Sequence, residues 1–256
     1  MKIALTGGIA CGKSLLARYL SSMGVAVIDA DDVVHELEAP GGAAVEPIVT
    51  RFGESVRAAD GGIDRRRLAE AVFGIENGEL RIENSFVNAG SPSGRARSPS
   101  APPSRIENGN APSGRAAAAR KDLEAILFPM VKRRIDEFFA SSHPTPDIRH
   151  PHPNSQFSIL NSQFSLAIIP LLFESHWDAD YDIIIALVSG HEAQIRRMAE
   201  TRGQSREEAE ARIAAQMPVE EKAARADYVI RNDSTPQALH AEAARLVEWL
   251  ESRIRG

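Results

Sequence analysis

The sequence is short of three features that would assign it to particular classes of protein: cysteine pairs, long apolar runs and excess positive charge. Cys11 is the single cysteine in 256 residues, so no internal disulfide can form, which suits a reducing compartment. No apolar run approaches the roughly 20 residues of a membrane span, and no signal-peptide core precedes the first predicted strand. The net charge of −5 gives no general attraction to nucleic acid or anionic lipid. We therefore expect a cytoplasmic globular protein, a monomer or weak homo-oligomer, without nucleic-acid or membrane partners.

The segment near the N-terminus carries the motif with the most chemical content. Residues 7–14 read Gly-Gly-Ile-Ala-Cys-Gly-Lys-Ser, which fits the phosphate-loop pattern of Gly, four residues, then Gly-Lys-Ser/Thr. Residues 2–6 predict a buried strand, and residues 14–21 predict the helix that has to follow such a loop. A chance match in a glycine-rich turn is the alternative, and this strand-loop-helix context disfavours it.

Each residue type in the loop has a physical reason to be there. The glycines allow backbone angles and close approaches that a Cβ atom would block. The loop N–H groups and the helix N-terminus present partial positive charge to a phosphate. Lys13 adds a cation for the β- and γ-phosphates of ATP, and the Ser14 hydroxyl can ligate Mg²⁺. The residues predicted to bind ATP are Gly7, Gly8, Ile9, Ala10, Cys11, Gly12, Lys13, Ser14 and Leu15.

The rest of the chain predicts an α/β fold. Apolar runs indicate further strands at 25–28, 166–169, 183–188 and 228–230. Helices are predicted at 31–38, 44–52, 64–73, 119–140, 191–226 with a break at Gly203, and 235–254. The strand-helix-strand spacing favours parallel, right-handed crossovers. We expect a P-loop NTPase fold, in which a five-stranded parallel sheet is flanked by helices. Pro129 is expected to kink the long helix.

The composition also suggests how the chain is divided. The predicted core comprises residues 1–31, 164–190 and 226–256, with a helical region at 32–140 and a predicted lid at 191–225. Residues 75–118 and 141–165 are rich in Gly, Pro, Ser and Asn and contain short internal echoes, such as Asn-Ser-Gln-Phe-Ser at 154–158 and 161–165. Such segments lack the apolar periodicity of a packed core. We interpret both segments as inserts that the fold does not need.

Charged side chains at the predicted strand ends are candidates for catalysis. Asp29 and Asp31 follow the second strand, and ligands in parallel sheets bind at the carboxyl ends of strands. Residues two apart on an extended strand point to the same side, so the pair can share one site. The alternative is that either aspartate merely caps the next helix. Glu174 follows the third strand and can orient a metal-bound water or bind substrate, although an exposed loop acid is equally compatible with the pattern.

The predicted lid is rich in arginine. Guanidinium groups bind phosphate in a fork geometry and suit a segment that closes over a substrate. Glutamates lie among them, so a solvated, salt-bridged helix is the alternative for any single arginine. Cys11 lies inside the loop, where a helix N-terminus can make a thiol reactive, but we interpret it as a small filler. The arginines concerned are Arg196, Arg197, Arg202 and Arg212.

Taken in order, these residues resemble the dephospho-CoA kinase family, whose members phosphorylate the ribose 3′-hydroxyl of dephospho-CoA. The resemblance implies ATP and Mg²⁺ as cofactors and dephospho-CoA as the small-molecule substrate. It also implies a single kinase domain in which the helical region at 32–140 binds the substrate. It also implies that Asp31 is the base toward the acceptor hydroxyl, that Lys13 and Arg197 act on the transferring phosphoryl group, and that Arg202 contacts the nucleotide. The motifs that carry it lie at 5–14, 27–31, 64–73, 123–129, 170–174, 194–202, 212–216 and 226–232.

Four residues depart from the pattern of that family. Ala10 and Ser234 stand where glycine is usual, Cys11 where serine is usual, and Phe128 where a histidine is usual. These departures keep two other interpretations open: another small-metabolite or nucleotide kinase, and a non-catalytic nucleotide-binding regulatory protein. A GTPase is disfavoured, because the sequence has no Asn-Lys-x-Asp element to read guanine.

Overall fold

The computed structural model describes residues 1–73, 114–141 and 164–255, so most of the two predicted inserts lies outside the described residues. The chain forms two compact units. Unit 1 comprises Met1–Glu36 and Pro129–Gly256, and unit 2 comprises Leu37–Phe128. None of the described helices is both long and apolar enough to span a bilayer.

Unit 1 is built on a parallel sheet of five strands, as the sequence predicts. The strands are β1 (Lys2–Gly7), β2 (Ala26–Asp29), β3 (Ser165–Ile168), β4 (Ile183–Val188) and β5 (Tyr228–Arg231). They are arranged in the order β2-β3-β1-β4-β5, with β1 in the middle. Leu5 on β1 lies beside Ile168 of β3 and Ile185 of β4. The parallel pairing brings the carboxyl ends of all five strands to one edge.

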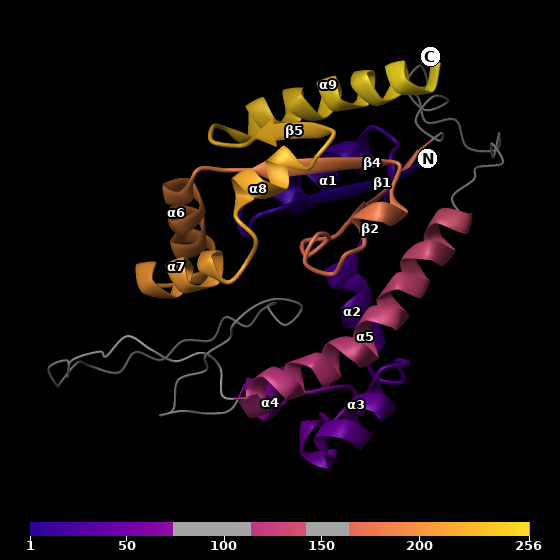
Figure 1. Ribbon diagram of the computed structural model, residues 1–256, viewed down its shortest axis with the longest axis vertical. Helices are drawn as coiled ribbons and strands as arrows, with labels where there is room; N and C mark the ends of the chain where they lie inside the picture. The colour runs from indigo at the N-terminus through magenta and orange to yellow at the C-terminus, as the bar shows by residue number, and fades with distance from the viewer. Residues whose placement is uncertain (74–113, 142–163, 256) are drawn as a thin grey trace, which may run out of the picture. The chain divides into compact units, whose positions relative to one another are not determined.

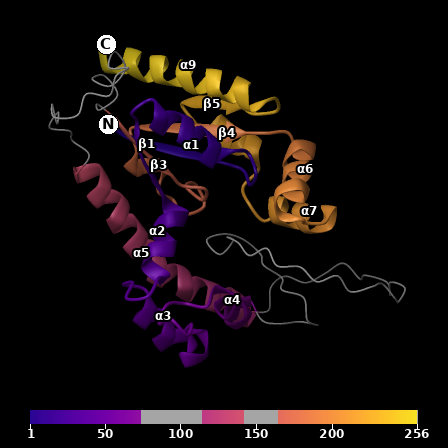
Figure 2. The same cartoon turned by 180° about the vertical axis from the view of Figure 1, so that it is seen from behind.

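One face of this sheet carries the main core of unit 1. Helices α1 (Lys13–Ser22) and α9 (Pro236–Arg255) pack together on it (Figures 1 and 2). Alternate residues of β1, such as Ile3 and Leu5, point into this core and meet Leu20 of α1 and Leu246 of α9. Helix α8 (Val219–Ala224) contacts β4 and β1 instead.

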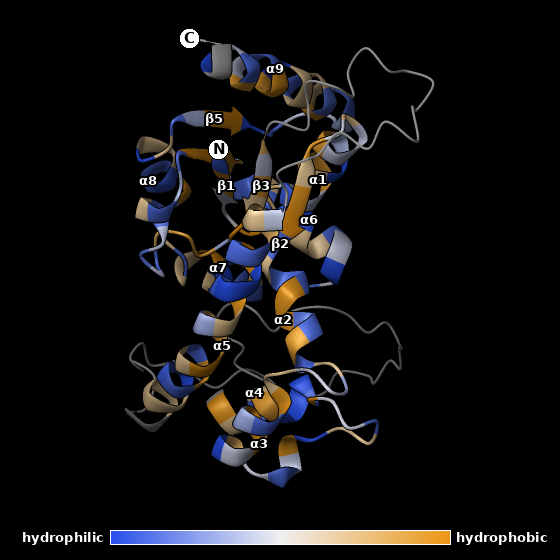
Figure 3. Cartoon of the chain, turned by 90° about the vertical axis from the view of Figure 1, so that its right-hand side faces the viewer, coloured by the Kyte–Doolittle hydropathy of each residue, from blue (hydrophilic) through white to orange (hydrophobic). Residues whose placement is uncertain are grey.

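The predicted helical stretch at 191–226 is three helices rather than two. They are α6 (His191–Arg202), α7 (Arg206–Ala214) and α8. The predicted break at Gly203 is confirmed, since its φ of 63° is left-handed, and a capping box of Ser205 and Glu208 starts α7. A second break was not predicted and falls before Pro218, the N-cap of α8. Figure 3 shows α7 largely in the colour of hydrophilic residues, which fits its exposed charges.

Unit 2 is helical. It contains α3 (Val45–Phe52), the 3₁₀ turn η1 (Glu54–Val56), α4 (Arg65–Phe73) and the first part of α5 (Gly114–Ser141). Arg51 Nε donates to Asp122 Oδ2 at 2.8 Å, which ties α3 to α5. Buried apolar side chains in these elements form the interior of the unit: Ile48, Val49, Val56, Leu68, Val72, Leu123 and Leu127.

Two helices pass from one unit to the other. Helix α2 (Ala30–Glu38) does so after Glu36, and α5 does so at Pro129. Helix α5 begins at Gly114, so the predicted insert at 75–118 extends five residues too far along the chain. The helix continues through Pro129, which stands inside it and has no N–H for the i→i−4 bond.

Candidate active site

The predicted phosphate loop joins β1 to α1 at the carboxyl edge of the sheet. Two of its glycines are required by the space available. A Cβ atom on Gly7 would lie 2.0 Å from the carbonyl oxygen of Leu187 on β4, and one on Gly12 would lie 2.6 Å from Asn232 Nδ2. Gly12 also has a φ of 97°, which side-chain-bearing residues rarely adopt. The glycines therefore let the loop lie close against β4 and the residue after β5.

Four polar side chains from distant parts of unit 1 hold the backbone of the loop. Gln194 Nε2 donates to the Ile9 carbonyl at 2.7 Å, and the Ile9 N–H donates to Gln216 Oε1 at 3.1 Å. Asn232 Nδ2 donates to the Cys11 carbonyl at 2.8 Å. Arg197 Nη1 donates to the Ala10 carbonyl at 3.2 Å. The loop shape is thus set by α6, by the residues between α7 and α8, and by the end of β5.

Lys13 opens α1, and its ammonium group lies against the loop. Its Nζ donates to the carbonyls of Gly7 at 3.1 Å and Gly8 at 2.8 Å. Burial lowers the pKa of the Lys13 ammonium, while the nearby negative charges of Asp31 and Asp29 act in the opposite direction. The fold therefore brings the cation of the loop together with both aspartates that the sequence singles out.

The two aspartates do not extend from one strand, as the sequence analysis expected. Strand β2 ends at Asp29 and α2 begins at Ala30, so Asp31 lies in the first turn of the helix. Asp29 Oδ1 accepts a hydrogen bond from the Asp31 N–H at 2.9 Å. The capping alternative is therefore confirmed for Asp29, because its carboxylate satisfies an N–H group at the start of α2. Burial first, and then repulsion from Asp31, raise the pKa of Asp29 to about 6.

This raised pKa predicts a pH-dependent gain in stability for Asp29→Asn. The ordinary pKa of the group is 3.8. The folded protein therefore binds the Asp29 proton more tightly than the unfolded chain does. This contribution to the free energy of unfolding is fully present below pH 3.8 and is lost as the pH rises through about 6. The amide keeps an oxygen for the Asp31 N–H without the buried charge. At pH 7.5 we expect the variant to be more stable by about 1–3 kcal/mol, and at pH 4 the difference should vanish.

Denaturant unfolding of the wild type and the variant at both pH values measures this difference. Asp32→Asn is the matched control, since Asp32 is exposed in the same turn of α2, and it should give no such gain. An Asp29→Asn protein that is destabilised equally at both pH values would contradict the assignment.

No group of three or more His, Cys, Asp and Glu side chains among the described residues is arranged to hold a metal ion. A Mg²⁺ ion that binds together with nucleotide phosphates needs only one or two protein ligands. Ser14 is exposed in the first turn of α1, directly after Lys13. The residues present therefore fit a phosphate-bound Mg²⁺, and the role of Ser14 as its ligand stays a prediction.

A cavity of about 260 Å³ adjoins the loop at Gly8. Its lining includes Ser189 at the end of β4, Gln194 of α6 and Gln216, which are provided by the core and by the predicted lid. The loop therefore adjoins a concave space in unit 1.

Comparison with known proteins places the chain in a family. Residues 1–87 and 142–237 match the family model of dephospho-CoA kinase. The chain belongs to the dephospho-CoA kinase family. It is 31% identical over 251 residues to the dephospho-CoA kinase of Bdellovibrio bacteriovorus, which covers 97% of this chain and 96% of the relative. It is 32% identical to that of Geobacter sulfurreducens, with 93% and 92% coverage.

Two solved structures share the fold of this chain. The crystal structure of TT1252 from Thermus thermophilus matches with a TM-score of 0.63 and 28% identity, over 97% of both chains. Dephospho-CoA kinase from Campylobacter jejuni matches with a TM-score of 0.50 and 21% identity, over 96% of this chain and 95% of that one. The second likeness supports the fold alone.

Arg197, expected from the resemblance to dephospho-CoA kinases to act on the transferring phosphoryl group, makes its contacts here with protein atoms. Besides the Ala10 carbonyl, its guanidinium donates to Ser189 Oγ at 2.8 Å and to the Asn232 carbonyl at 2.6 Å. It thus links the phosphate loop to the ends of β4 and β5. A further contact of Arg197 with the phosphoryl group stays a prediction.

The other lid arginines differ in their surroundings. Arg202 is the last residue of α6 and is exposed. Burial, and then the like charge of Arg202, lower the pKa of Arg212 on α7, so the two guanidinium groups lie near each other. Arg196 is exposed and 3.9 Å from Glu200, one turn along α6, as the salt-bridge alternative expects. Arg202 and Arg212 remain the candidates for contact with an anionic ligand.

Ala10 departs from the glycine usual in dephospho-CoA kinases, and its backbone conformation is unfavourable for alanine. Its φ of 56° lies in the left-handed region, where an alanine is disfavoured by about 1–2 kcal/mol. Glycine adopts this conformation without the clash but loses more entropy on folding. We expect Ala10→Gly to stabilise the protein by about 0.5–1 kcal/mol.

Thermal unfolding of Ala10→Gly beside Ala199→Gly measures this effect. Ala199 is exposed inside α6, so the same substitution there should destabilise the protein by about 1 kcal/mol. If both substitutions lower the melting temperature alike, the strain at Ala10 is absent.

The sequence analysis missed one charged residue beside the loop. Lys222 of α8 is fully buried, and its Nζ lies 2.8 Å from Glu174 Oε1. Its place within Val-Glu-Glu-Lys-Ala-Ala gave it the appearance of a solvated charge. The available signal was its spacing, because Lys222 falls three residues after Val219 and shares the inward side of the helix. Cys11 is also buried, which raises the pKa of its thiol, in keeping with a small filler.

Proposed function

We propose that this member of the dephospho-CoA kinase family transfers the γ-phosphoryl group of ATP to the ribose 3′-hydroxyl of dephospho-CoA. The observation that carries the proposal is the coincidence of family membership with the loop geometry. Lys13, its loop carbonyl partners, Asp29 at the end of β2 and Asp31 at the start of α2 gather at the carboxyl edge of one parallel sheet. Phosphoryl transfer needs such a cradle, a cation and an acid beside the acceptor.

The loop residues have distinct roles in this proposal. The N–H groups of residues 7–15 and the start of α1 hold the ATP phosphates. Lys13 neutralises charge on the β- and γ-phosphates, and Ser14 holds Mg²⁺. A bound Mg²⁺ ion supplies charge stabilisation to the phosphates during transfer. Arg197 and Arg202 add positive charge from the lid.

Asp31 positions or deprotonates the acceptor hydroxyl in this mechanism. The carboxylate lies in the first turn of α2, where the Asp29 carboxylate accepts the hydrogen bond of its N–H. That bond fixes the backbone of Asp31 relative to the end of β2, so the carboxylate is presented from a rigid element. The proton of the hydroxyl goes to Asp31 as the oxygen attacks the γ-phosphorus, and ADP leaves.

We assign the helical unit 2 to binding of the acceptor. It provides a core of its own, joined to unit 1 through α2 and α5. The chain is expected to act in the cytoplasm as a monomer or weak homo-oligomer, and to have no nucleic-acid partner.

ADP release with and without dephospho-CoA tests the function. Release should depend on dephospho-CoA and Mg²⁺, and mass spectrometry should find one added phosphoryl group on the acceptor. Nucleoside monophosphates and shikimate serve as rival acceptors. Product from one of these instead would reassign the substrate. ATP binding without any product would favour the non-catalytic regulatory protein, an interpretation to which the strained Ala10 gives some support.

A further inference from the structure

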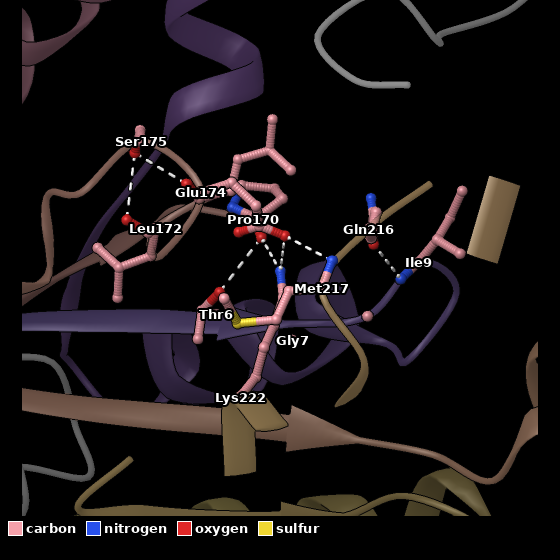
Figure 4. A network of polar contacts seen from close by, with 12 residues as sticks. Thr6, Gly7, Ile9, Pro170, Leu172, Glu174, Ser175, Gln216, Met217 and Lys222 are labelled. Atoms are coloured by element: carbon pink, nitrogen blue, oxygen red, sulfur yellow. Dashed lines mark hydrogen bonds and ion pairs between the residues drawn. The ribbon is translucent and has the colours of Figure 1, made fainter. Parts of the chain in front are cut away.

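The residues that follow β3 place a carbonyl and a carboxylate beside a buried lysine. Lys222 Nζ donates to the Pro170 carbonyl at 2.7 Å and forms an ion pair with Glu174 Oε1 at 2.8 Å (Figure 4). The Lys222 side chain has no exposed surface, whereas 25% of the Glu174 side chain is exposed. A fully buried ammonium group is costly unless it is paired and hydrogen-bonded, so this arrangement needs a compensating role.

Both partners of Lys222 make a second contact that leads toward the phosphate loop. The Pro170 carbonyl also accepts a hydrogen bond from Thr6 Oγ1 at 3.3 Å, and Thr6 directly precedes the loop. Glu174 Oε1 also accepts a hydrogen bond from the Met217 N–H at 3.0 Å. Lys222 therefore joins β1, the segment after β3 and the segment between α7 and α8.

The segment between α7 and α8 carries this linkage to the loop itself. Gln216 precedes Met217, and its Oε1 accepts the hydrogen bond of the Ile9 N–H at 3.1 Å. Two adjacent residues of this short segment therefore have different partners. Met217 is bonded to Glu174 of the ion pair, and Gln216 is bonded to Ile9 of the loop (Figure 4). Moving Met217 would move Gln216 with it, because neighbouring Cα atoms are a fixed distance apart.

We propose that Lys222 and Glu174 form a positioning clamp that sets the shape of the phosphate loop through Met217 and Gln216. Neither Lys222 nor Glu174 lines the cavity that adjoins the loop, so the clamp is proposed to act through the protein. Its effect is to hold the Ile9 N–H and the neighbouring loop amides in the arrangement that receives phosphates. The positive charge of Lys222 also contributes to the lowered pKa of the Lys13 ammonium, which places the clamp close behind the loop. The inference rests on the proposed function only in assuming that the loop binds ATP.

The first test is the affinity for ATP and Mg²⁺, measured by calorimetry without any acceptor. Lys222→Met keeps most of the apolar stem and removes the ammonium, and Gln216→Ala removes the contact with Ile9. Each should raise the Kd for ATP about tenfold. Lys222→Met removes the contacts with Pro170 and Glu174, and Gln216→Ala removes the hydrogen bond with Ile9. The Kd of the double variant Lys222→Met/Gln216→Ala should not exceed the higher of the two single-variant Kd values, because both substitutions act through the same segment. If the double variant raises the Kd by the product of the two single-variant factors, the proposal is overturned.

The second test separates positioning from a contribution to folding alone. Lys222→Met leaves the Glu174 charge without its partner and can impair folding. Lys222→Met/Glu174→Gln removes both charges, and thermal unfolding should show a melting temperature close to that of the wild type. The amide at position 174 keeps an oxygen for the Met217 N–H, but Lys222 no longer holds that side chain in place. We therefore expect the tenfold loss of ATP affinity to persist in this variant. Wild-type affinity in a well-folded Lys222→Met/Glu174→Gln protein would overturn the clamp.

Lys132→Met is the matched control, because Lys132 is also ion-paired, to Asp180 at 2.8 Å, but lies on α5 and is partly exposed. It should leave the Kd for ATP unchanged. Because calorimetry requires no phosphoryl acceptor, an inactive enzyme that still binds ATP would refute the proposed function and leave the clamp open to test.

Discussion

Replacing Lys13 with alanine should lower kcat/KM for ATP by roughly two to three orders of magnitude. The Lys13 ammonium lies in the concavity of the loop, where burial lowers its pKa and the carbonyls of Gly7 and Gly8 hold it. Lys13 is partly buried there, so its positive charge acts more strongly than it would in bulk water on charge that develops on a phosphoryl group. Steady-state kinetics with ATP as the varied substrate measures the loss.

The matched control for this prediction is Lys2→Ala. Lys2 is on the same strand-loop-helix segment but is paired with Asp136 at 2.9 Å and has 42% of its side chain exposed. Removing such a pair should change stability by less than about 1 kcal/mol and leave turnover intact. A Lys13→Ala protein that folds and keeps a near-normal rate would refute the role assigned to Lys13.

Replacing Asp31 with asparagine should lower kcat by roughly two to four orders of magnitude while ATP still binds. An amide occupies the same space but cannot take the proton of the acceptor hydroxyl. The backbone of Asp31 should stay in place, because its N–H donates to Asp29 Oδ1 and not to its own side chain. Single-turnover rates measure the chemical step, and calorimetry measures the affinity for ATP.

Asp32→Asn is the control for this effect, since Asp32 is the next residue of α2 and is exposed. It should retain the wild-type kcat. If Asp31→Asn loses ATP affinity instead of kcat, the carboxylate serves the metal ion rather than the acceptor.

The parts of the fold that the sequence predicts well are those governed by local patterns. The run Ile183–Val188 is wholly apolar, and β4 has these same bounds. The phosphate loop is recognisable because its backbone needs glycine at particular places, such as Gly12 with its φ of 97°. Helix α9 was predicted at 235–254 and extends over Pro236–Arg255, because its buried residues recur at helical spacing.

The errors arise where a local signal competes with a neighbouring one. Gly114 and the alanines after it were grouped with the insert, although they begin α5, because the preceding Gly, Pro and Ser dominated the composition. Asp31 was placed on an extended strand end, whereas capping by Asp29 starts α2 one residue earlier. The second break in the lid was missed although Pro218, the N-cap of α8, is itself a signal for an interruption, because the charged residues on both sides of it favour helix.

The sequence by itself determined the parallel α/β architecture, the phosphate loop and the candidate charges Lys13, Asp29 and Asp31, because strand periodicity and glycine requirements depend on neighbouring residues. Lys222 was not among these candidates, because only its burial in the fold distinguishes it from a solvated charge. Only the tertiary structure decided what those charges contact. Lys222 meets Pro170, which is 52 residues away in the chain, and Arg197 meets the loop from 187 residues away. Partners so far apart leave no periodic trace, since burial and hydrogen bonding of a charged side chain depend on which segments the sheet brings together.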